Sequence, residues 1–304
     1  MKLEGKKILI TGPAGQIAFP LAERLAEEND VWGIARFSDG KSRERCESAG
    51  ITTRTVDLGA PEWGDLPDDF DYVLHLAAVI GPGEDYDASL LINAEGTGRL
   101  MSRFRDAKAC LMMSTCGVYA SPADGDRAVV ESDPLGGSPQ PYAPTYCVSK
   151  IGQEAVARFA ATEFALPTTI ARMNAAYGDN GGLPAMLVAP ILAGHPIPLL
   201  AGHSICSPIH EDDIYDQTPG LLAAASVPAT ISNWGGDQPV DLAELCRYIG
   251  ELVGKDVTFT ESGDGIHQYR LDPARRRELA GPCRVDWREG VRRMLEARHP
   301  EALV

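Results

Sequence analysis

ILITGPAGQIAFPLAERLAEE, residues 8–28, joins a short apolar run to an amphipathic helical pattern through a turn that contains two glycines. Gly12 permits a tight turn, and Gly15 lets the backbone approach a pyrophosphate closely. The small side chain of Ala18 allows the helix to pack tightly on the strand. The helix N-terminus offers free N–H groups and a partial positive charge to phosphates. Placed between a strand and a helix, this turn predicts dinucleotide binding; a purely structural turn is the alternative.

The alternation of apolar runs and helical patterns continues through the first two thirds of the chain. Strands are expected at 7–11, 30–35, 51–57, 71–78, 109–115 and 168–173, and helices at 16–28, 87–105 and 142–164. Continuous apolar strands that alternate with helices predict an α/β fold, a Rossmann-type doubly wound parallel sheet. Beyond Tyr177 shorter helical patterns follow, at about 211–225, 241–253 and 287–297. We therefore expect a dinucleotide-binding domain at 1–178 and a smaller, partly interleaved substrate-binding region at 179–304.

The composition of the 304-residue chain is that of a globular protein, with 44% hydrophobic and 23% charged residues. Its net charge of −15 argues against a nucleic-acid binder or a partner of anionic membranes. The seven cysteines form no CxxC pair, so neither a disulfide framework nor a metal site is expected. The N-terminal apolar run is too short for a signal peptide, and no stretch approaches a membrane span. Reduced thiols then favour the cytoplasm.

The end of the second expected strand bears on the choice of dinucleotide. An acidic residue there would hold a ribose 2′-hydroxyl and repel a 2′-phosphate, but Ala35 stands at that place and Arg36 follows it. Arginine suits bidentate phosphate contacts, and Ser38 and Lys41 are close enough in sequence to assist. We therefore expect NADP(H) rather than NAD(H), with stacking of Arg36 on adenine as the alternative. Asp57, which ends the third strand, is either an adenine contact or a strand-end cap.

Tyr146 and Lys150 stand four positions apart in the helical stretch YCVSKIGQEAVARFA, which begins at residue 146. That spacing places both side chains on one face of a helix, about one turn apart. The fifth expected strand ends in Ser114 and Thr115, and carboxyl ends of strands form the ligand crevice of a doubly wound sheet. A hydroxyl there can donate to a substrate oxygen. Taken alone, each feature is better explained by an ordinary helix surface or a turn cap.

Six motifs together resemble the extended short-chain dehydrogenase/reductases, and most closely the NAD-dependent epimerase/dehydratase family. TGPAGQIA, LHLAA, NAEGTGRL, STCGVYA, YCVSK and RMNAAYG occur in that family's order and at about its spacing, and cover residues 1 to about 180. The resemblance implies that Tyr146 is the catalytic acid/base and that Lys150 supports it and binds the nicotinamide ribose. Thr115 would orient the substrate oxygen. A nearby ammonium and the nicotinamide cation would both lower the pKa of the tyrosine.

The resemblance also assigns the walls of the site. Residues expected at the cofactor are Gly12, Gly15, Gln16, Ile17, Arg36, Asp57, Leu58, Leu76, Ala77, Ala78 and Lys150. Residues expected at the substrate are Asn93, Cys116 and Asn174.

Two departures from the family pattern limit the chemistry. The dehydratases carry an Asp-Glu pair directly after the catalytic threonine, where this chain has Cys116 and Gly117, so dehydration is disfavoured. Epimerases of nucleotide sugars usually hold the substrate diphosphate with an arginine near the position of Cys206. No Lys or Arg lies between Arg172 and Arg247, which favours a neutral or carboxylated small molecule.

We therefore expect an NADP-dependent oxidoreductase that interconverts a ketone and a secondary alcohol of a small molecule. The alternative is a nucleotide-sugar epimerase with tightly bound NAD, and a non-catalytic dinucleotide-binding protein is a third hypothesis. Family analogy further suggests a homodimer formed through the helices near Asp87 and Tyr142.

Overall fold

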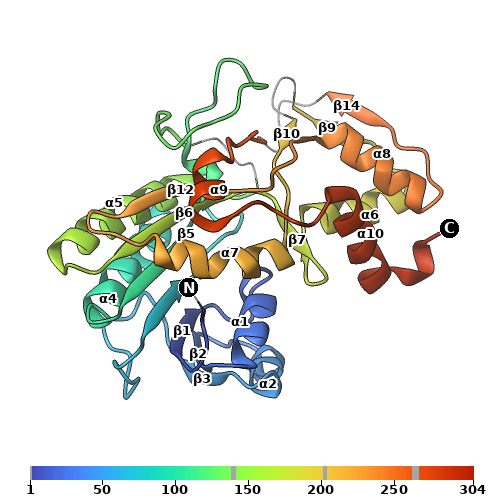
Figure 1. Cartoon of the computed structure of the whole chain (residues 1–304). Helices are drawn as coiled ribbons and strands as arrows, with labels where there is room; N and C mark the ends of the chain where they lie inside the picture. The colour runs from blue at the N-terminus through green and yellow to red at the C-terminus, as the bar shows by residue number, and fades with distance from the viewer. Residues whose placement is uncertain (1, 138–141, 201–203, 262–266) are drawn as a thin grey trace.

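A parallel sheet of seven strands forms the centre of the computed structural model, which describes residues 2–137, 142–200, 204–261 and 267–304 (Figure 1). The strands lie in the order β3-β2-β1-β4-β5-β6-β12. Their bounds are β1 Lys7–Thr11, β2 Asp30–Ala35, β3 Thr52–Thr55, β4 Tyr72–His75, β5 Ala109–Thr115, β6 Thr168–Met173 and β12 Thr230–Trp234. The order reverses between β1 and β4, and the carboxyl ends of strands at such a point form a ligand crevice. The predicted Rossmann-type fold is confirmed.

Helices cover both faces of the sheet. The bounds are α1 Ala18–Ala26, α2 Gly40–Ser48, α3 Tyr86–Leu90, α4 Gly96–Arg103, α5 Tyr146–Glu163 and α7 Glu211–Ala223. Strand residues alternate between the faces, so that Ile8 and Ile10 pack with α1 and α7 whereas Leu9 packs with α4 and α5. Both apolar layers are fully buried, which explains why the strands read as continuous apolar runs.

Several elements differ in extent from the sequence-based expectation. Helix α1 begins at Ala18 because the residues from Gly15 onward still form the turn, in which the Gly15 amide donates to the Gly12 carbonyl over 2.9 Å. Helix α5 begins at Tyr146 rather than at Tyr142. The helix expected at 87–105 is divided by a π-helical segment, Leu91–Glu95, which connects α3 to α4. Strands β3 and β4 are shorter than expected at both ends.

A second lobe has a hydrophobic core of its own, formed mainly by the apolar faces of α6, α8 and α10. Its elements are β7 Ala176–Gly178, β8 Gly181–Gly182, α6 Leu183–Leu192, β9 Ile197–Leu199, β10 Ile205–Cys206, β11 Ile209–His210, β13 Val240–Asp241, α8 Leu242–Leu252, β14 Phe259–Glu261 and α10 Trp287–Arg298, whereas α9 Ala274–Ala280 packs on α7 and β12 beside the main sheet. Short 3-10 turns lie at Cys116–Val118 and Pro300–Ala302. Between these elements the chain returns to the sheet as α7 and β12 (Figure 1). The division at residue 178 stays a prediction.

Membrane-spanning helices, metal-ligand clusters and disulfides were each sought among the described residues. Among them, no helix combines the length and the apolar character needed to cross a membrane. Within the same described ranges, no three His, Cys, Asp or Glu side chains are grouped so as to hold a metal ion. All seven cysteines lie in the described part of the chain and none is in a disulfide.

Candidate active site

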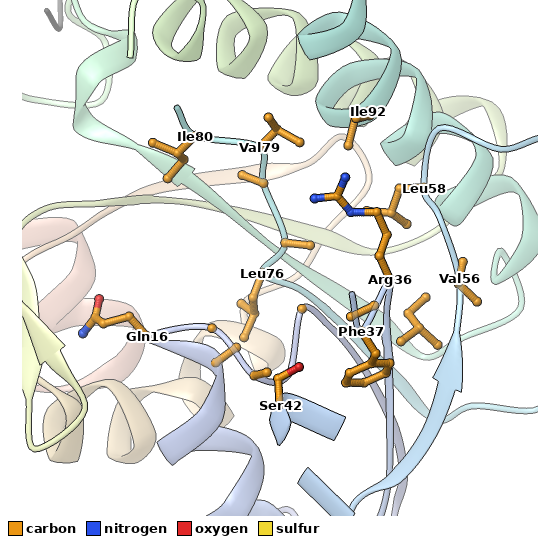
Figure 2. Close-up of a pocket in the computed structure, with 18 of the residues that line it drawn as sticks. Gln16, Arg36, Phe37, Ser42, Val56, Leu58, Leu76, Val79, Ile80 and Ile92 are labelled. Carbon is orange, nitrogen blue, oxygen red and sulfur yellow. The ribbon is translucent and has the colours of Figure 1, made fainter. Parts of the chain in front are cut away.

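A cavity of about 450 Å³ opens at the carboxyl ends of β1, β2 and β4 and reaches the first turn of α5. Every residue predicted to bind the cofactor lies on its wall, from the glycine turn to Lys150. Figure 2 shows the labelled part of this wall, with Gln16 on one side and Arg36, Leu58 and Ile92 on the other. Tyr146 also lines the cavity, so the predicted acid/base and the predicted dinucleotide turn share one space.

The glycine turn packs directly against the segment that follows β4. Gly12 has a φ of +67°, and a Cβ added there would lie 3.1 Å from the Cβ of Ala77. The hydroxyl of Thr11 accepts hydrogen bonds from the amides of Leu76 and Ala77, over 3.0 and 2.9 Å. The two segments therefore form one rigid backbone floor beneath the cavity, which leaves space for a ligand where side chains would otherwise stand.

The far end of the cavity carries an acid that the sequence analysis missed. Arg36 and Ser38 line it as expected, but Asp39 does so too. Its carboxylate accepts a hydrogen bond from the Ser42 amide over 2.6 Å and so caps helix α2. The sequence analysis expected an acid at position 35, where the chain has Ala35. The loop after β2 instead places Asp39, four positions later, in the cavity wall. An N-cap pattern, Asp39 before a helix, was the available signal.

Tyr146, Lys150 and Thr115 come together where α5 meets the end of β5. The Lys150 ammonium donates to the Met113 carbonyl over 2.7 Å and lies 6.0 Å from the centroid of the Tyr146 ring. The Thr115 hydroxyl accepts from the Gly117 amide over 3.1 Å and also makes a hydrogen bond with the Tyr146 side chain. The structure therefore places a phenol, an amine and a hydroxyl within one small cluster.

The pKa of Tyr146 differs from the expectation. Burial raises it above the ordinary value, and the hydrogen bond with Thr115 opposes this only in part. Burial also lowers the pKa of Lys150 to about 7, because an ammonium loses hydration there, while Glu154 acts in the opposite direction. The protein alone therefore favours the neutral phenol. The predicted lowering of the tyrosine pKa therefore needs positive charge beyond that of Lys150, which a bound cationic cofactor would supply.

Asn93, which was expected at the substrate, is buried and hydrogen-bonded within the protein. It is 1% exposed, in the π-helical segment. Its amide oxygen accepts from the Val79 amide over 2.8 Å, and its amide nitrogen donates to the Val79 carbonyl and to the Ser149 hydroxyl over 3.2 and 2.9 Å. Both polar atoms of its side chain are used in these bonds, so Asn93 secures the chain after β4, and its contact with a substrate stays a prediction.

Cys116 and Asn174 do lie together, beside a residue that sequence reasoning missed. The Asn174 amide nitrogen donates to the Cys116 sulfur over 3.4 Å and to the Tyr269 carbonyl over 2.8 Å. Burial raises the pKa of Cys116 to about 12, so this side chain is a thiol and not a thiolate. Tyr269 comes from the distant end of the chain, and no motif in the sequence points to it.

A second missed group is the buried polar cluster around His75. Its Nδ1 lies 2.8 Å from the Thr11 hydroxyl, and its Nε2 lies 2.7 Å from the Thr97 hydroxyl. The Gln153 amide donates to the same Thr97 hydroxyl over 2.9 Å. Burial, aided by the Lys150 charge, lowers the pKa of His75 to about 3, so the ring is neutral. This cluster ties β1, β4, α4 and α5 together below the cavity.

Comparison with known proteins agrees with this architecture. The model of the family described as "NAD dependent epimerase/dehydratase family" matches residues 8–216. A trifunctional UDP-glucose 4,6-dehydratase/UDP-4-keto-6-deoxy-D-glucose 3,5-epimerase/UDP-4-keto-L-rhamnose-reductase of Arabidopsis thaliana is 25% identical, over 97% of this chain and 48% of that protein. A dTDP-L-rhamnose 4-epimerase of Burkholderia thailandensis is 25% identical, over 83% of this chain and 82% of that protein. The chain thus spans about half the length of the Arabidopsis relatives it matches.

Solved structures show the same fold over nearly the whole chain. The UDP-glucuronic acid 4-epimerase of Bacillus cereus, in complex with UDP-glucuronic acid and NAD, has a TM-score of 0.80 at 22% identity and covers 96% of this chain and 98% of its own. A UDP-N-acetylglucosamine 4-epimerase of Methanobrevibacter ruminantium reaches a TM-score of 0.83 at 18% identity, with 98% and 99% covered. The match of the family model over most of the chain goes further than the fold: this protein belongs to the NAD-dependent epimerase/dehydratase family of the short-chain dehydrogenase/reductases.

Proposed function

We propose that the protein is an NAD-dependent enzyme that oxidises a secondary alcohol of a nucleotide sugar and reduces the ketone again, as an epimerase does. The observation that carries this proposal is the single cavity that joins the glycine turn to Tyr146 and Lys150. NAD, when bound, would accept a hydride and return it. The protein would bind the dinucleotide through the Gly12–Ala77 floor and present its proton-transfer groups at the other end.

Each catalytic side chain has a defined task in this proposal. Tyr146 removes the proton from the substrate hydroxyl during oxidation and returns it during reduction. Thr115 holds the same oxygen close to the phenol, because its hydroxyl already reaches the tyrosine. Lys150, anchored on the Met113 carbonyl, supplies positive charge that favours the phenolate. Dehydration is not proposed, because Cys116 and Gly117 offer no acid and base beside the threonine.

The proposal exchanges the expected NADP for NAD. Asp39 brings a carboxylate into the ribose end of the cavity, where it would accept from a 2′-hydroxyl and repel a 2′-phosphate. Several structural neighbours contain NAD, among them the Bacillus cereus 4-epimerase. Arg36 remains the argument for NADP. Figure 2 shows its side chain extending toward the wall formed by Leu58, Val79 and Ile92, which suits stacking on adenine as well as phosphate binding.

A second candidate is a reductase of a small ketone, as first expected. It is favoured by the stretch from Arg172 to Arg247, which contains no Lys or Arg to hold a diphosphate. Cys206, near the place of the usual arginine, is buried and its thiol donates to the Val240 carbonyl over 3.6 Å. A neutral or carboxylated substrate would need no such cation.

One experiment separates these functions. Purified protein is denatured, and the released nucleotide is identified by chromatography as NAD, NADP or neither. Native protein is then incubated with UDP-sugars and dTDP-sugars, and products are followed by proton NMR. Interconversion of two epimers without net change in NADH absorbance supports the epimerase. Stoichiometric loss of NADPH with a ketone panel supports the reductase. Cofactor binding without any conversion supports the non-catalytic hypothesis.

Two further proposals concern assembly and location. Leu91, Val148 and Phe159, on the π-helical segment and α5, are 38%, 44% and 64% exposed, which suits a homodimer formed through these neighbouring helices. A monomer by light scattering would contradict this. We also propose a cytoplasmic location, because seven cysteines without a disulfide suit a reducing compartment.

A further inference from the structure

Three side chains on α5, spaced by four residues, contact three consecutive residues at the end of β5. Tyr146 meets Thr115, and Lys150 donates to the Met113 carbonyl over 2.7 Å. The third member is Glu154, whose carboxylate accepts from the Ser114 hydroxyl over 2.5 Å. The predicted catalytic pair, Tyr146 and Lys150, therefore belongs to a row of three side chains on one face of α5. The third is Glu154, a buried acid to which the sequence analysis gave no role.

Glu154 is fixed by an arginine on the neighbouring strand. The Arg172 guanidinium donates to both carboxylate oxygens, over 2.9 and 2.7 Å. The two side chains are 1% and 2% exposed. Arg172 is the β6 residue paired in register with Ser114 of β5. The carboxylate is thus held from the helix, from β5 and from β6 at once.

A buried ion pair of this kind contributes little to stability compared with an apolar pair, because both charges lose their hydration. Its stronger effect is to fix geometry. We propose that Glu154, oriented by Arg172 and tied to Ser114, is a positioning residue that sets α5 on β5 and places a negative charge one helical turn from Lys150. The proposal rests on the proposed function, in which Lys150 serves Tyr146.

The charged and titratable groups that face Lys150 are few. Tyr146 and Glu154 lie on its own helix, and the neutral His75 approaches from the end of β4. Burial lowers the pKa of Lys150 to about 7, and Glu154 is the group that raises it. Without the acid, Lys150 would lose its proton at a lower pH, and the ammonium that favours the phenolate would be depleted near neutrality.

The test follows the titration of Lys150 directly. Protein labelled with ¹³C at the lysine ε-carbon is titrated by NMR, and the Lys150 signal is assigned by its loss in Lys150→Arg. In the double variant E154Q/R172M both charges are removed while the glutamine keeps an acceptor for Ser114. We expect its Lys150 midpoint to move down, because Glu154 is the charge that raises the pKa of Lys150. An unchanged midpoint in the folded variant overturns the proposal.

Controls separate this effect from general destabilisation. Glu163→Gln removes an exposed charge from the same helix, and Asp237→Asn breaks the buried pair with Arg276 of α9, which is built without any residue of α5 or β5. Both should leave the Lys150 midpoint unchanged. Should E154Q/R172M not fold, Glu154→Asp keeps the pair with Arg172 but withdraws the carboxylate from Ser114. A midpoint below that of the wild type supports the proposal, and an equal one overturns it.

The titration of Lys150 and the test of the proposed function can fail independently. The titration needs no substrate, so a protein that converts no nucleotide sugar can still show the shift. Conversely, normal epimerisation together with an unchanged midpoint would reject the role of Glu154 and leave the proposed function intact.

Discussion

The predicted cofactor side and the predicted substrate side of the site are built in opposite ways. The predicted cofactor side is built on a recognisable backbone turn at the strand ends, where Gly12 and Ala77 approach closely. On the predicted substrate side Cys116 and Asn174 meet Tyr269, and these three residues are far apart in sequence. A phosphate-binding turn needs a fixed backbone conformation and therefore a recognisable motif. A wall made of single side chains from several elements can change one residue at a time, which is how specificity diverges on a common fold.

The largest effect is expected where the two sides meet. In Tyr146→Phe the phenol oxygen is lost, so turnover should fall by at least about 10²-fold, the usual contribution of an acid/base group. The affinity for NAD should stay within about twofold, because the glycine turn is untouched. Turnover is measured by NMR with the active nucleotide sugar, and affinity by fluorescence titration. Undiminished turnover would remove Tyr146 from the mechanism.

The next prediction tests whether cofactor binding depends on the backbone conformation of Gly12 and on its close approach to Ala77. Gly12→Ala forces a left-handed residue that costs about 1–2 kcal/mol and places a methyl group 3.1 Å from the Cβ of Ala77. We expect NAD affinity to fall about tenfold or more. Gly5→Ala is the matched control, since Gly5 has a φ of +61° but a Cβ there meets nothing within 4 Å. Equal losses of affinity in both variants would contradict a specific role for Gly12.

A smaller effect should distinguish the two dinucleotides. Asp39→Asn keeps a cap for α2 but removes the charge at the ribose end. NADPH affinity should rise relative to NADH by about five- to tenfold, the size of one charge contact. Arg36→Ala is the reciprocal variant, and loss of NADPH affinity alone would restore the original NADP hypothesis. Parallel fluorescence titrations with both nucleotides measure the ratio.

The last prediction concerns stability rather than ligand binding, and it involves the His75 cluster beneath both sides. In the folded protein the pKa of His75 is about 3, whereas the unperturbed value is 6.5. Between these values the unfolded chain binds a proton that the folded chain does not, so stability falls as the pH falls. This contributes up to about 1.4 kcal/mol per pH unit below pH 6.5. Thermal unfolding between pH 7 and 5 should show a shallower decline in His75→Gln than in wild type.

His299→Gln provides the control for that slope, because His299 caps the end of α10, away from the cluster. Its unfolding temperature should decline with pH as in wild type. If the unfolding temperature of His75→Gln declined with pH as steeply as that of the wild type, His75 would not be the source of the pH dependence.

The sequence predicted what depends on local pattern. The β1–turn–α1 unit, the sheet and the Tyr146–Lys150 pair follow from periodicity, glycine placement and helical spacing, and the family match confirms the fold. The sequence analysis missed Asp39 because the acid lies in a loop, four positions after the place where it was expected. The hydrogen bonds of Asn93 could not be predicted, since a π-helical segment turns its amide toward Val79. Tyr269 and Arg172 depend on long-range packing that no local pattern records.

The late return of the chain to the sheet has a consequence for how the protein is made. Strand β12 pairs with β6 along its whole length, from Thr230 beside Thr169 to Trp234 beside Met173. Helix α7, which covers part of one face, also comes after the first elements of the second lobe. A growing chain that ends at residue 178 therefore has a bare β6 edge and an uncovered apolar face, which are aggregation hazards. Synthesis must pass residue 234 before the first half of the molecule can close.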